Sequence, residues 1–402
     1  LSWTPCSLTV PQEHRTKQGL PAGRILSFPK QTASATSGPT ETTHTHHRKG
    51  KDMSPDSIYV DHRELHRFMK DGLMAMGVPE DEAEICADVL IESDLRGIRS
   101  HGIGRYKMYI DRMREGIINP VCRMTTVSET DNTAVIDAKD SLGHVVAKRS
   151  MQLAIDKAKA HNVGIVAVRN STHFGICGYY PAMAVANDMV GLSFSNARPS
   201  VAPTYGVEPV VGTNPISFGA PTDEVYPFLL DIATSTTQRG KIEVYAREGK
   251  PTPRGLTIDI HGNQPTDSDA LLRMFVEGTA SLLPLGGAGE ELGGHKGYGL
   301  GVMVEILCAA FSGGSFGRAL SGLSEGKPVP HRLGHFFAAI NIASFVPVSV
   351  FKAITGSIMR EIRSSAKVPG HDRIFVAGEK EFEMIERRRK EGIPVNRPLQ
   401  KI

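Results

Sequence analysis

The sequence pattern of a folded protein begins near Asp56, and from there hydrophobic residues recur at helical spacing. Asp61 can cap a helix that runs towards Met76. Pro79, followed by three acids, is typical of a second helix start, because acidic side chains favour the positive end of the helix dipole. Beyond a polar loop with glycines, four more apolar residues keep helical spacing: Tyr106, Tyr109, Ile110 and Met113. The first part of the folded unit is therefore predicted to be helical.

The middle of the chain alternates short apolar runs with longer amphipathic segments. The short runs predict buried strands at 164–168, 191–195 and 227–231. The longer segments predict helices at 144–161 and 179–189. Four further elements are expected towards the C-terminus: a helix at 296–311, a strand at 335–345, and helices at 347–364 and 379–390. This order, without an internal repeat, predicts a mixed α/β protein whose sheet-bearing centre lies between helix-rich ends.

On this pattern the chain divides into an N-terminal helical part (56–125), a central domain (126–332) and a C-terminal part that completes the fold (333–402). Residues 1–55 are rich in Thr, Ser, Pro, Lys and Arg and have few acids, so we expect a disordered leader. Organelle transit peptides share this composition, but no amphipathic apolar face is evident, and an extension without a targeting role is an equal alternative. We expect a cytoplasmic protein, or an organellar one if the leader is a transit peptide.

Composition and charge exclude several classes of partner. The 402 residues are 40% hydrophobic and 22% charged, with a net charge of +3, an ordinary globular balance. Basic residues are interspersed with acids, which argues against a nucleic-acid partner. The longest apolar stretch, 336–351, contains polar residues and a proline and is too short to span a membrane. The five cysteines are odd in number and widely spaced, which indicates reduced thiols rather than a disulfide framework or a zinc site.

Several common catalytic motifs are absent from the sequence. No Gly-x-Gly-x-x-Gly follows a predicted strand, which disfavours a Rossmann cofactor site. The phosphate-binding P-loop, the Gly-x-Ser-x-Gly of serine hydrolases and the His-Glu-x-x-His of zinc proteases are also missing. Phosphoryl transfer, serine hydrolysis and zinc proteolysis therefore lose their main sequence support, and we expect no metal.

The first polar constellation lies at 99–105. Ser100 and His101 can donate or accept hydrogen bonds, and Arg105 has the planar fork that binds a carboxylate through two hydrogen bonds. Tyr109 lies four residues later, on the same face of the expected helix. A capped helix start with a solvated arginine explains these residues equally well.

The second constellation, 170–175, follows the strand that is expected to end at Val168. It places His173 between small hydroxyl residues and a glycine, where the ligand sites of α/β proteins gather. A neutral imidazole can take a proton from a hydroxyl, and an imidazolium can return one to a carbonyl oxygen. The alternative is a hydrogen-bonded loop histidine with a structural role.

The third constellation combines 212–215, 231–236 and 293–299. The glycines of the last segment let the backbone approach a ligand, and Lys296 at a helix start adds a positive charge, which suits a dinucleotide phosphate or ribose. The same glycines could merely shape a tight turn, and Asp231 could be a strand-end cap.

Together these segments resemble the malate/L-lactate dehydrogenase family. This family is distinct from the Rossmann-type malate and lactate dehydrogenases and includes ureidoglycolate, sulfolactate and diketogulonate dehydrogenases and cyclic imino-acid reductases. The resemblance covers roughly 57–395 and is carried by 94–102, 170–175, 212–215, 229–234 and 294–300, with a shorter match at 391–394. The leader has no counterpart in the family, and 254–292 departs from the family pattern, which could give an unusual substrate preference.

The resemblance implies a non-Rossmann NAD(P)-binding fold, a homodimer and a small carboxylate substrate bound between domains. It implies that His173 is the proton donor and acceptor. It places Arg105 as the carboxylate anchor, with Ser100, His101 and Tyr109 beside it. It also implies contacts with NAD or NADP at nine positions: Asn196, Ala197, Asp231, Ile232, Ala233, Lys296, Gly297, Gly378 and Glu379.

The activity so implied is hydride transfer between the nicotinamide ring and a 2-hydroxy acid of the malate or lactate type. A cyclic imino-acid reductase of the same family would use the same carboxylate geometry with a C=N acceptor. A catalytically silent NAD-binding dimer is the alternative from another class. The joint presence of His173, Arg105 and Lys296 argues against the silent protein.

Overall fold

Three helices follow one another at the start of the part that this computed structural model describes, residues 57–396. They are α1 (His62–Ala75), α2 (Glu80–Leu95) and α3 (Ile103–Arg114). The Asp61 carboxylate accepts a hydrogen bond from the backbone N–H of Arg63 (2.8 Å) and caps α1. The predicted helical start of the folded unit is thus confirmed, whereas the predicted leader lies outside the described residues.

Seven strands form the central sheet, in the order β2-β3-β4-β12-β5-β6-β7. Their bounds are β2 (Thr125–Glu129), β3 (Thr133–Asp137), β4 (Val163–Ser171), β12 (Leu333–Asn341), β5 (Met189–Ser195), β6 (Ile216–Ala220) and β7 (Phe228–Ile232). β3 runs parallel to β4, and the other neighbours are antiparallel. β12, which comes late in the sequence, lies between β4 and β5, where Phe337 pairs with both Val166 and Ser193. The expected mixed α/β class is confirmed.

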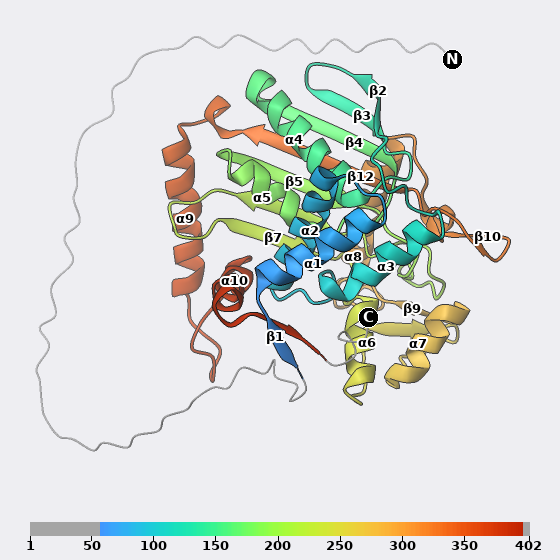
Figure 1. Cartoon of the computed structure of the whole chain (residues 1–402). Coiled ribbons are helices and arrows are strands. Elements are labelled where there is room, and N and C mark those ends of the chain that lie inside the picture. The colour runs from blue at the N-terminus through green and yellow to red at the C-terminus, as the bar shows by residue number, and fades with distance from the viewer. Residues whose placement is uncertain (1–56, 397–402) are drawn as a thin grey trace, which may run out of the picture. The chain divides into compact units, whose positions relative to one another are not determined.

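Helices cover both faces of this sheet (Figure 1). Their bounds are α4 (Gly143–His161), α5 (Tyr179–Val185) and α8 (Gly294–Glu305), the last continuing into a π-helical turn (Ile306–Ala310). Side chains of β12 alternate between the faces: Phe337 and Ala339 pack with α4 and α5, and Phe336 and Ala338 pack with α8 and its π-helical turn. Because both faces of the sheet are covered, this strand is almost entirely apolar.

Both ends of the described chain contribute to a second core around α1, α2 and α3. β1 (Ile58–Val60) pairs antiparallel with β13 (Ile393–Val395). Ile385 of α10 (Glu379–Glu391) packs in the same cluster as Leu65 of α1. The helix-rich part is therefore built from both ends of the described chain.

Two predicted elements end four residues earlier than expected. The helix expected at 179–189 ends at Val185, since Met189 already begins β5. The strand expected at 335–345 ends at Asn341, whose side chain accepts from the backbone N–H of Ala343 (3.1 Å) and starts a short 3-10 helix. The helix after Pro347 is α9 (Val348–Ser364), as expected.

The remaining elements were not predicted from the sequence, and several lie in the stretch that departs from the family pattern. They are α6 (Arg239–Arg247), β8 (Thr257–Asp259), α7 (Ser268–Glu277), β9 (Ala280–Leu282), a 3-10 helix (Gly317–Leu320), β10 (Leu323–Ser324) and β11 (Lys327–Pro328). Ile242, Leu271 and Ala280 join α6, α7 and β9 in a small core of their own.

Within residues 57–396, no helix is both long enough and apolar enough to cross a bilayer. The cysteines of this part are free thiols, as expected: Cys86, Cys177 and Cys308 are buried and Cys122 is partly buried. Cys6 lies outside the described residues.

Candidate active site

His173 lies on the loop between β4 and α5. The hydroxyl of Tyr109, from α3, lies 2.5 Å from Nδ1 of His173, and the backbone N–H of Gly175 points at the same nitrogen at 3.3 Å. Within residues 57–396, no hydrogen bond is made by Nε2, which is therefore the nitrogen available to a ligand. The fold thus joins two predicted site residues that are far apart in the sequence.

The loop between α2 and α3 forms a second wall of the site. The ring of His101 stacks on that of His173, with centroids 5.4 Å apart. The hydroxyl of Ser100 lies 2.8 Å from Nδ1 of His101, and the side-chain amide of Gln238 donates to that hydroxyl (3.1 Å). Ser100 and His101 therefore lie beside His173. Gln238, at the start of α6, was missed because no recognisable motif surrounds it.

Arg105 lies on the first turn of α3. Its Nε donates to the backbone oxygen of Ser100 (2.8 Å), which fixes the direction of the side chain. Among the residues that the structure describes, no carboxylate oxygen lies within 4 Å of its guanidinium group. The terminal nitrogens of Arg105 are thus free to bind an acidic ligand.

Burial is the main electrostatic influence on the two stacked histidines. It lowers the pKa of His173 well below its ordinary value, and repulsion of a second positive charge by four neighbouring basic side chains lowers it further: His101, His144, Arg105 and Arg112. Burial also lowers the pKa of His101 to about 4, and the charge of Arg105 contributes. Both rings are therefore neutral near neutral pH, and His173 is ready to accept a proton.

Two buried histidines behind the site were not singled out from the sequence. The ring of His144 lies edge-on to the ring of Tyr109, with centroids 4.7 Å apart, and burial lowers the pKa of His144 to about 3. His335, on β12, lies 2.8 and 2.9 Å from two serine hydroxyls of neighbouring strands and stacks on Phe174. Because Phe174 follows His173, this stack holds the loop that carries the proposed acid–base.

The backbone before His173 also packs closely against the start of α4. A Cβ at Gly143 would lie 2.3 Å from the carbonyl oxygen of Thr172 and 2.6 Å from that of His173. The hydroxyl of Thr172 accepts from the backbone N–H of Gly143 (2.9 Å). A glycine is therefore required at this position for the loop to keep its place.

β7 ends beside the same loop. The carboxylate of Asp231 accepts from the backbone N–H of Gly178 (2.7 Å). Burial raises the pKa of Asp231 to about 6, although this hydrogen bond and the charge of Arg96 oppose the rise. Ile232 and Ala233, which are partly buried, continue from Asp231. The strand end predicted to contact a cofactor is thus tied to the loop that holds His173.

A buried polar network joins other loops of the predicted cofactor site. The amide nitrogen of Asn214 donates to the carboxylate of Glu305 (2.7 Å), and its oxygen accepts from the backbone N–H of Ala197 (3.0 Å). The side-chain oxygen of Asn196 accepts from the backbone N–H of Gly334 (2.7 Å). Asn196 therefore uses its side chain inside the protein. Glu305 was missed because it stands alone in an apolar helix.

The start of α8 lies next to the segment that follows Asp231. A Cβ at Gly297 would lie 2.1 Å from the carbonyl oxygen of Leu285, whose own N–H donates to the carbonyl of Thr234 (2.9 Å). Lys296 is exposed on the first turn, and no carboxylate of residues 57–396 lies within 4 Å of its ammonium group. A glycine-rich helix start with an unpaired lysine fits an anionic group such as a dinucleotide phosphate.

The turn at Gly378 and Glu379 lies against β7. A Cβ at Gly378 would contact Leu229 at 3.2 Å. The buried carboxylate of Glu379 accepts from the backbone N–H of Val376 (2.9 Å) and pairs with two arginines at 3.4 and 3.5 Å. The carboxylate is thus occupied, and the backbone of the turn is what remains for a ligand.

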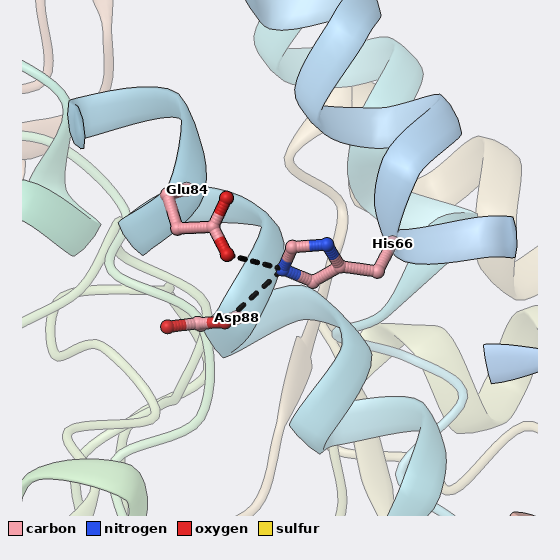
Figure 2. Close-up of side chains that lie close together, drawn as sticks. All are labelled: His66, Glu84 and Asp88. Carbon is pink, nitrogen blue, oxygen red and sulfur yellow. Dashed lines mark hydrogen bonds and ion pairs between the residues drawn. The ribbon is translucent and has the colours of Figure 1, made fainter. Parts of the chain in front are cut away.

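A separate polar cluster lies between α1 and α2. Figure 2 shows His66 directed at the carboxylates of Glu84 and Asp88, with Nε2 at 3.6 and 3.1 Å from their oxygens. Within residues 57–396, this is the one group of three histidine, cysteine or acidic side chains whose possible metal-binding atoms all lie within 4.8 Å of one another. Each carboxylate also pairs with a lysine through its other oxygen, Glu84 with Lys70 (2.9 Å) and Asp88 with Lys148 (3.3 Å). The trio is therefore part of a charge-balanced network that needs no metal.

The residues around His173 can perform one kind of chemistry well. They combine a neutral proton acceptor, an arginine able to hold a carboxylate, and glycine-rich loops suited to a phosphate-bearing cofactor. This combination suits proton exchange at a hydroxyl or carbonyl next to a carboxylate.

Comparison with known proteins gives consistent matches over almost all of the described chain. A family model described as malate/L-lactate dehydrogenase matches residues 60–402. The chain is 45% identical to a malate dehydrogenase of Pyrococcus horikoshii over 342 residues, which cover 85% of this chain and 92% of the relative. It is 39% identical to an L-sulfolactate dehydrogenase of Methanothermobacter thermautotrophicus, covering 83% and 92%. The crystal structure of malate dehydrogenase from Entamoeba histolytica superposes with a TM-score of 0.83 at 41% identity, covering 86% and 96%.

Proposed function

Since the chain belongs to the malate/L-lactate dehydrogenase family and is a 2-hydroxyacid dehydrogenase, we propose that His173 is its catalytic acid–base and that Arg105 binds the substrate carboxylate. The observation that carries this proposal is the 2.5 Å contact between Tyr109 and Nδ1 of His173, which leaves Nε2 available to the substrate. This contact also joins the helical part at 56–125 to the central part at 126–332, between which we place the substrate.

Each residue has a defined part in the reaction. In the oxidising direction, neutral His173 with its own proton on Nδ1, donated to the hydroxyl of Tyr109, accepts the hydroxyl proton of the substrate at Nε2 while Arg105 holds the carboxylate. In the reducing direction, protonated His173 returns the proton to the carbonyl oxygen. A nicotinamide ring, when bound, accepts or supplies the hydride at its C4. A hydroxyl can donate to an unprotonated nitrogen or accept from a protonated one, so Tyr109 keeps its contact with His173 in every protonation state.

The reaction uses a nicotinamide cofactor, which we propose to be NAD or NADP held by the loops around Asp231 and Lys296. The exposed, unpaired Lys296 at the glycine-rich start of α8 supports this placement. The proposed contacts are Asn196, Ala197, Asp231, Ile232, Ala233, Lys296, Gly297, Gly378 and Glu379. The side chains of Asn196 and Glu379 are occupied within the protein, so these two residues would contact the cofactor through their backbone.

We also propose that the protein is a homodimer. Its support is a row of exposed aliphatic side chains on α9, four residues apart, with exposed fractions of 44–56%: Val350, Ile354, Ile358 and Ile362. A continuous apolar row of this kind is uncommon on a monomer and is typical of an association surface.

A substrate panel with one variant tests the proposed roles. NADH and NADPH oxidation is followed with the 2-keto acids of malate, lactate and sulfolactate and with a cyclic imino acid. His173→Ala should reduce turnover with the preferred 2-keto acid by roughly a hundredfold or more, because acid–base assistance is lost, while cofactor affinity stays close to normal. Near-normal turnover of this variant would remove His173 from the mechanism. A preference for the imino acid would instead indicate a reductase of C=N bonds.

A further inference from the structure

A chain of three hydrogen-bonded side chains connects the start of α6 to the ring that stacks on His173. The side-chain amide of Gln238 donates to the hydroxyl of Ser100 (3.1 Å), and this hydroxyl lies 2.8 Å from Nδ1 of His101. The rings of His101 and His173 have centroids 5.4 Å apart, and their planes are 25° from parallel. Gln238 therefore reaches the neighbour of the proposed acid–base through two short contacts.

The packing of α6 against Ser100 keeps Gln238 within reach. A Cβ at Gly240, on the first turn of α6, would lie 3.2 Å from the Cβ of Ser100. Ile242, one turn after Gln238, is buried in the small core that α6 shares with α7 and β9. The backbone oxygen of Ser100 accepts from Nε of Arg105 (2.8 Å). Both ends of the contact between Gln238 and Ser100 are thus held in place.

The donors and acceptors along this chain decide where its protons lie. An amide nitrogen can only donate, so the hydroxyl of Ser100 accepts from Gln238 and keeps its own hydrogen to donate. In the described part of the chain, the one acceptor within hydrogen-bond distance of this hydroxyl is Nδ1 of His101, which therefore carries no proton. Burial lowers the pKa of His101 to about 4, so the ring is neutral near neutral pH and its single proton lies on Nε2.

The two stacked histidines consequently offer different groups to a ligand. Neutral His173 has its proton on Nδ1, at the hydroxyl of Tyr109, and its Nε2 is an acceptor. Nε2 of His101 is a donor. Among residues 57–396, neither Nε2 has a hydrogen-bond partner, whereas Nδ1 of each ring has one. An oxygen that exchanges a proton with His173 can therefore receive a hydrogen bond from His101.

We propose that Gln238 is a positioning residue that acts through Ser100 to keep the proton of His101 on Nε2, from which His101 donates a hydrogen bond to the oxygen on C2 of the substrate. This inference rests on the proposed function of His173 as the acid–base. Negative charge grows on that oxygen when hydride reaches the carbonyl carbon, or when the hydroxyl proton leaves, and a fixed donor stabilises this charge. His173 exchanges the proton, and His101 stabilises the oxygen.

Two substitutions of Gln238 separate the direction of the hydrogen bonds from packing. Gln238→Glu keeps the shape but replaces the donor by an acceptor, so Ser100 would donate to the new carboxylate and accept from Nδ1 of His101. Gln238→Met removes the hydrogen bond and leaves Ser100 able to donate to His101.

NMR of the ring nitrogens in protein labelled with nitrogen-15 histidine reports the tautomer directly. At about pH 8 both histidine and glutamate side chains have lost their titrating protons. The signals of His101 are identified by their loss in His101→Gln. We expect the proton of His101 on Nε2 in the wild type and in Gln238→Met, and on Nδ1 in Gln238→Glu.

Steady-state kinetics with the preferred 2-keto acid give a second readout. kcat should fall by roughly tenfold or more in Gln238→Glu, because the donor to the C2 oxygen is lost, and by less in Gln238→Met. A residue that served packing alone would give the opposite order, since glutamate matches glutamine in shape. The same two substitutions at Gln152, an exposed glutamine on α4 that donates to Asp156 (2.9 Å), are the matched controls and should leave kcat unchanged.

Three results would each overturn the inference. They are a proton on Nδ1 of His101 in the wild type, an unchanged tautomer in Gln238→Glu, and an unchanged kcat in Gln238→Glu, whether or not the substrate KM rises. The tautomer is measured without turnover. A wild-type protein that reduces no 2-keto acid would therefore contradict the proposed function, whereas the NMR result would still decide whether Gln238 sets the tautomer of His101.

Discussion

The hydroxyl of Tyr109 lies 2.5 Å from Nδ1 of His173, across the junction between the helical part and the central sheet. A hydrogen bond to the nitrogen that does not face the substrate fixes the orientation of an imidazole ring and decides which nitrogen carries the proton. The proposed acid–base is therefore positioned by a residue from another part of the fold.

Replacement of Tyr109 by Phe tests this positioning. The ring would keep its packing against His144, but the hydroxyl would be lost. We expect kcat to fall by roughly 10- to 100-fold, because His173 would no longer be held in one orientation, while KM changes little. The pH profile should shift as well, which a purely structural defect would not cause.

Tyr106→Phe is the matched control for this experiment. It removes a hydroxyl from the same helix, one that donates to the backbone oxygen of Met69 (3.0 Å) and not to the site. Equal effects of the two substitutions on kcat would contradict the role given to Tyr109.

The burial of His173 predicts opposite pH dependence in the two directions of the reaction. Because its pKa is lowered, the free enzyme holds neutral His173 at pH 7 and above. For oxidation, kcat/KM should therefore be level at neutral pH and above, and should fall only at a pH well below the ordinary histidine pKa of about 6.5. For reduction, the protonated form of His173 is needed, so kcat/KM should fall by roughly tenfold for each unit by which the pH exceeds the lowered pKa of His173. Initial rates between pH 5 and 9 measure both limbs. A rate of reduction that does not change with pH would show that His173 is not the proton donor.

The sequence predicted much of this fold because its hydrophobic pattern is local. The periods that define α1, α2 and α4 need only the residues of each helix. The place of β12 in the sheet could not be predicted, since Phe337 pairs with Val166 and Ser193, which come more than a hundred residues earlier. An apolar run is compatible with any central position in a sheet.

The candidate site also contains residues that a local sequence pattern predicts and residues that it does not. His173, Arg105 and Tyr109 stand in recognisable segments, and the structure brings them together. Gln238 and Glu305 act through contacts that no local pattern reveals, because each partner comes from a distant segment. Asn196 illustrates the opposite case: its position was predicted near the cofactor, but only the structure shows that its amide is used within the protein.

Lys296 provides a test of the proposed cofactor site. It has no carboxylate partner among residues 57–396 and stands at the glycine-rich start of α8, so its charge is available for a phosphate. Lys296→Ala should raise the KM for NADH or NADPH by roughly 5- to 50-fold, since an ion pair with a phosphate is lost, and should change the substrate KM less. Lys250→Ala, at an exposed lysine paired with Glu248, is the control. A normal cofactor KM in Lys296→Ala would place the cofactor phosphates elsewhere.

The apolar row on α9 predicts how the proposed dimer can be separated. Ile354 and Ile358 are more than half exposed. Phe351, on the same helix, packs against the core beside the sheet, so α9 is attached to the protein by its other face. Ile354→Glu combined with Ile358→Glu should leave the fold intact, because neither side chain is buried, but should convert a dimer to a monomer in light scattering after gel filtration. Val276→Glu, at a residue on α7 that is 75% exposed, is the matched control and should leave the molar mass unchanged. A double variant with the mass of the wild type would show that α9 does not form the contact between subunits.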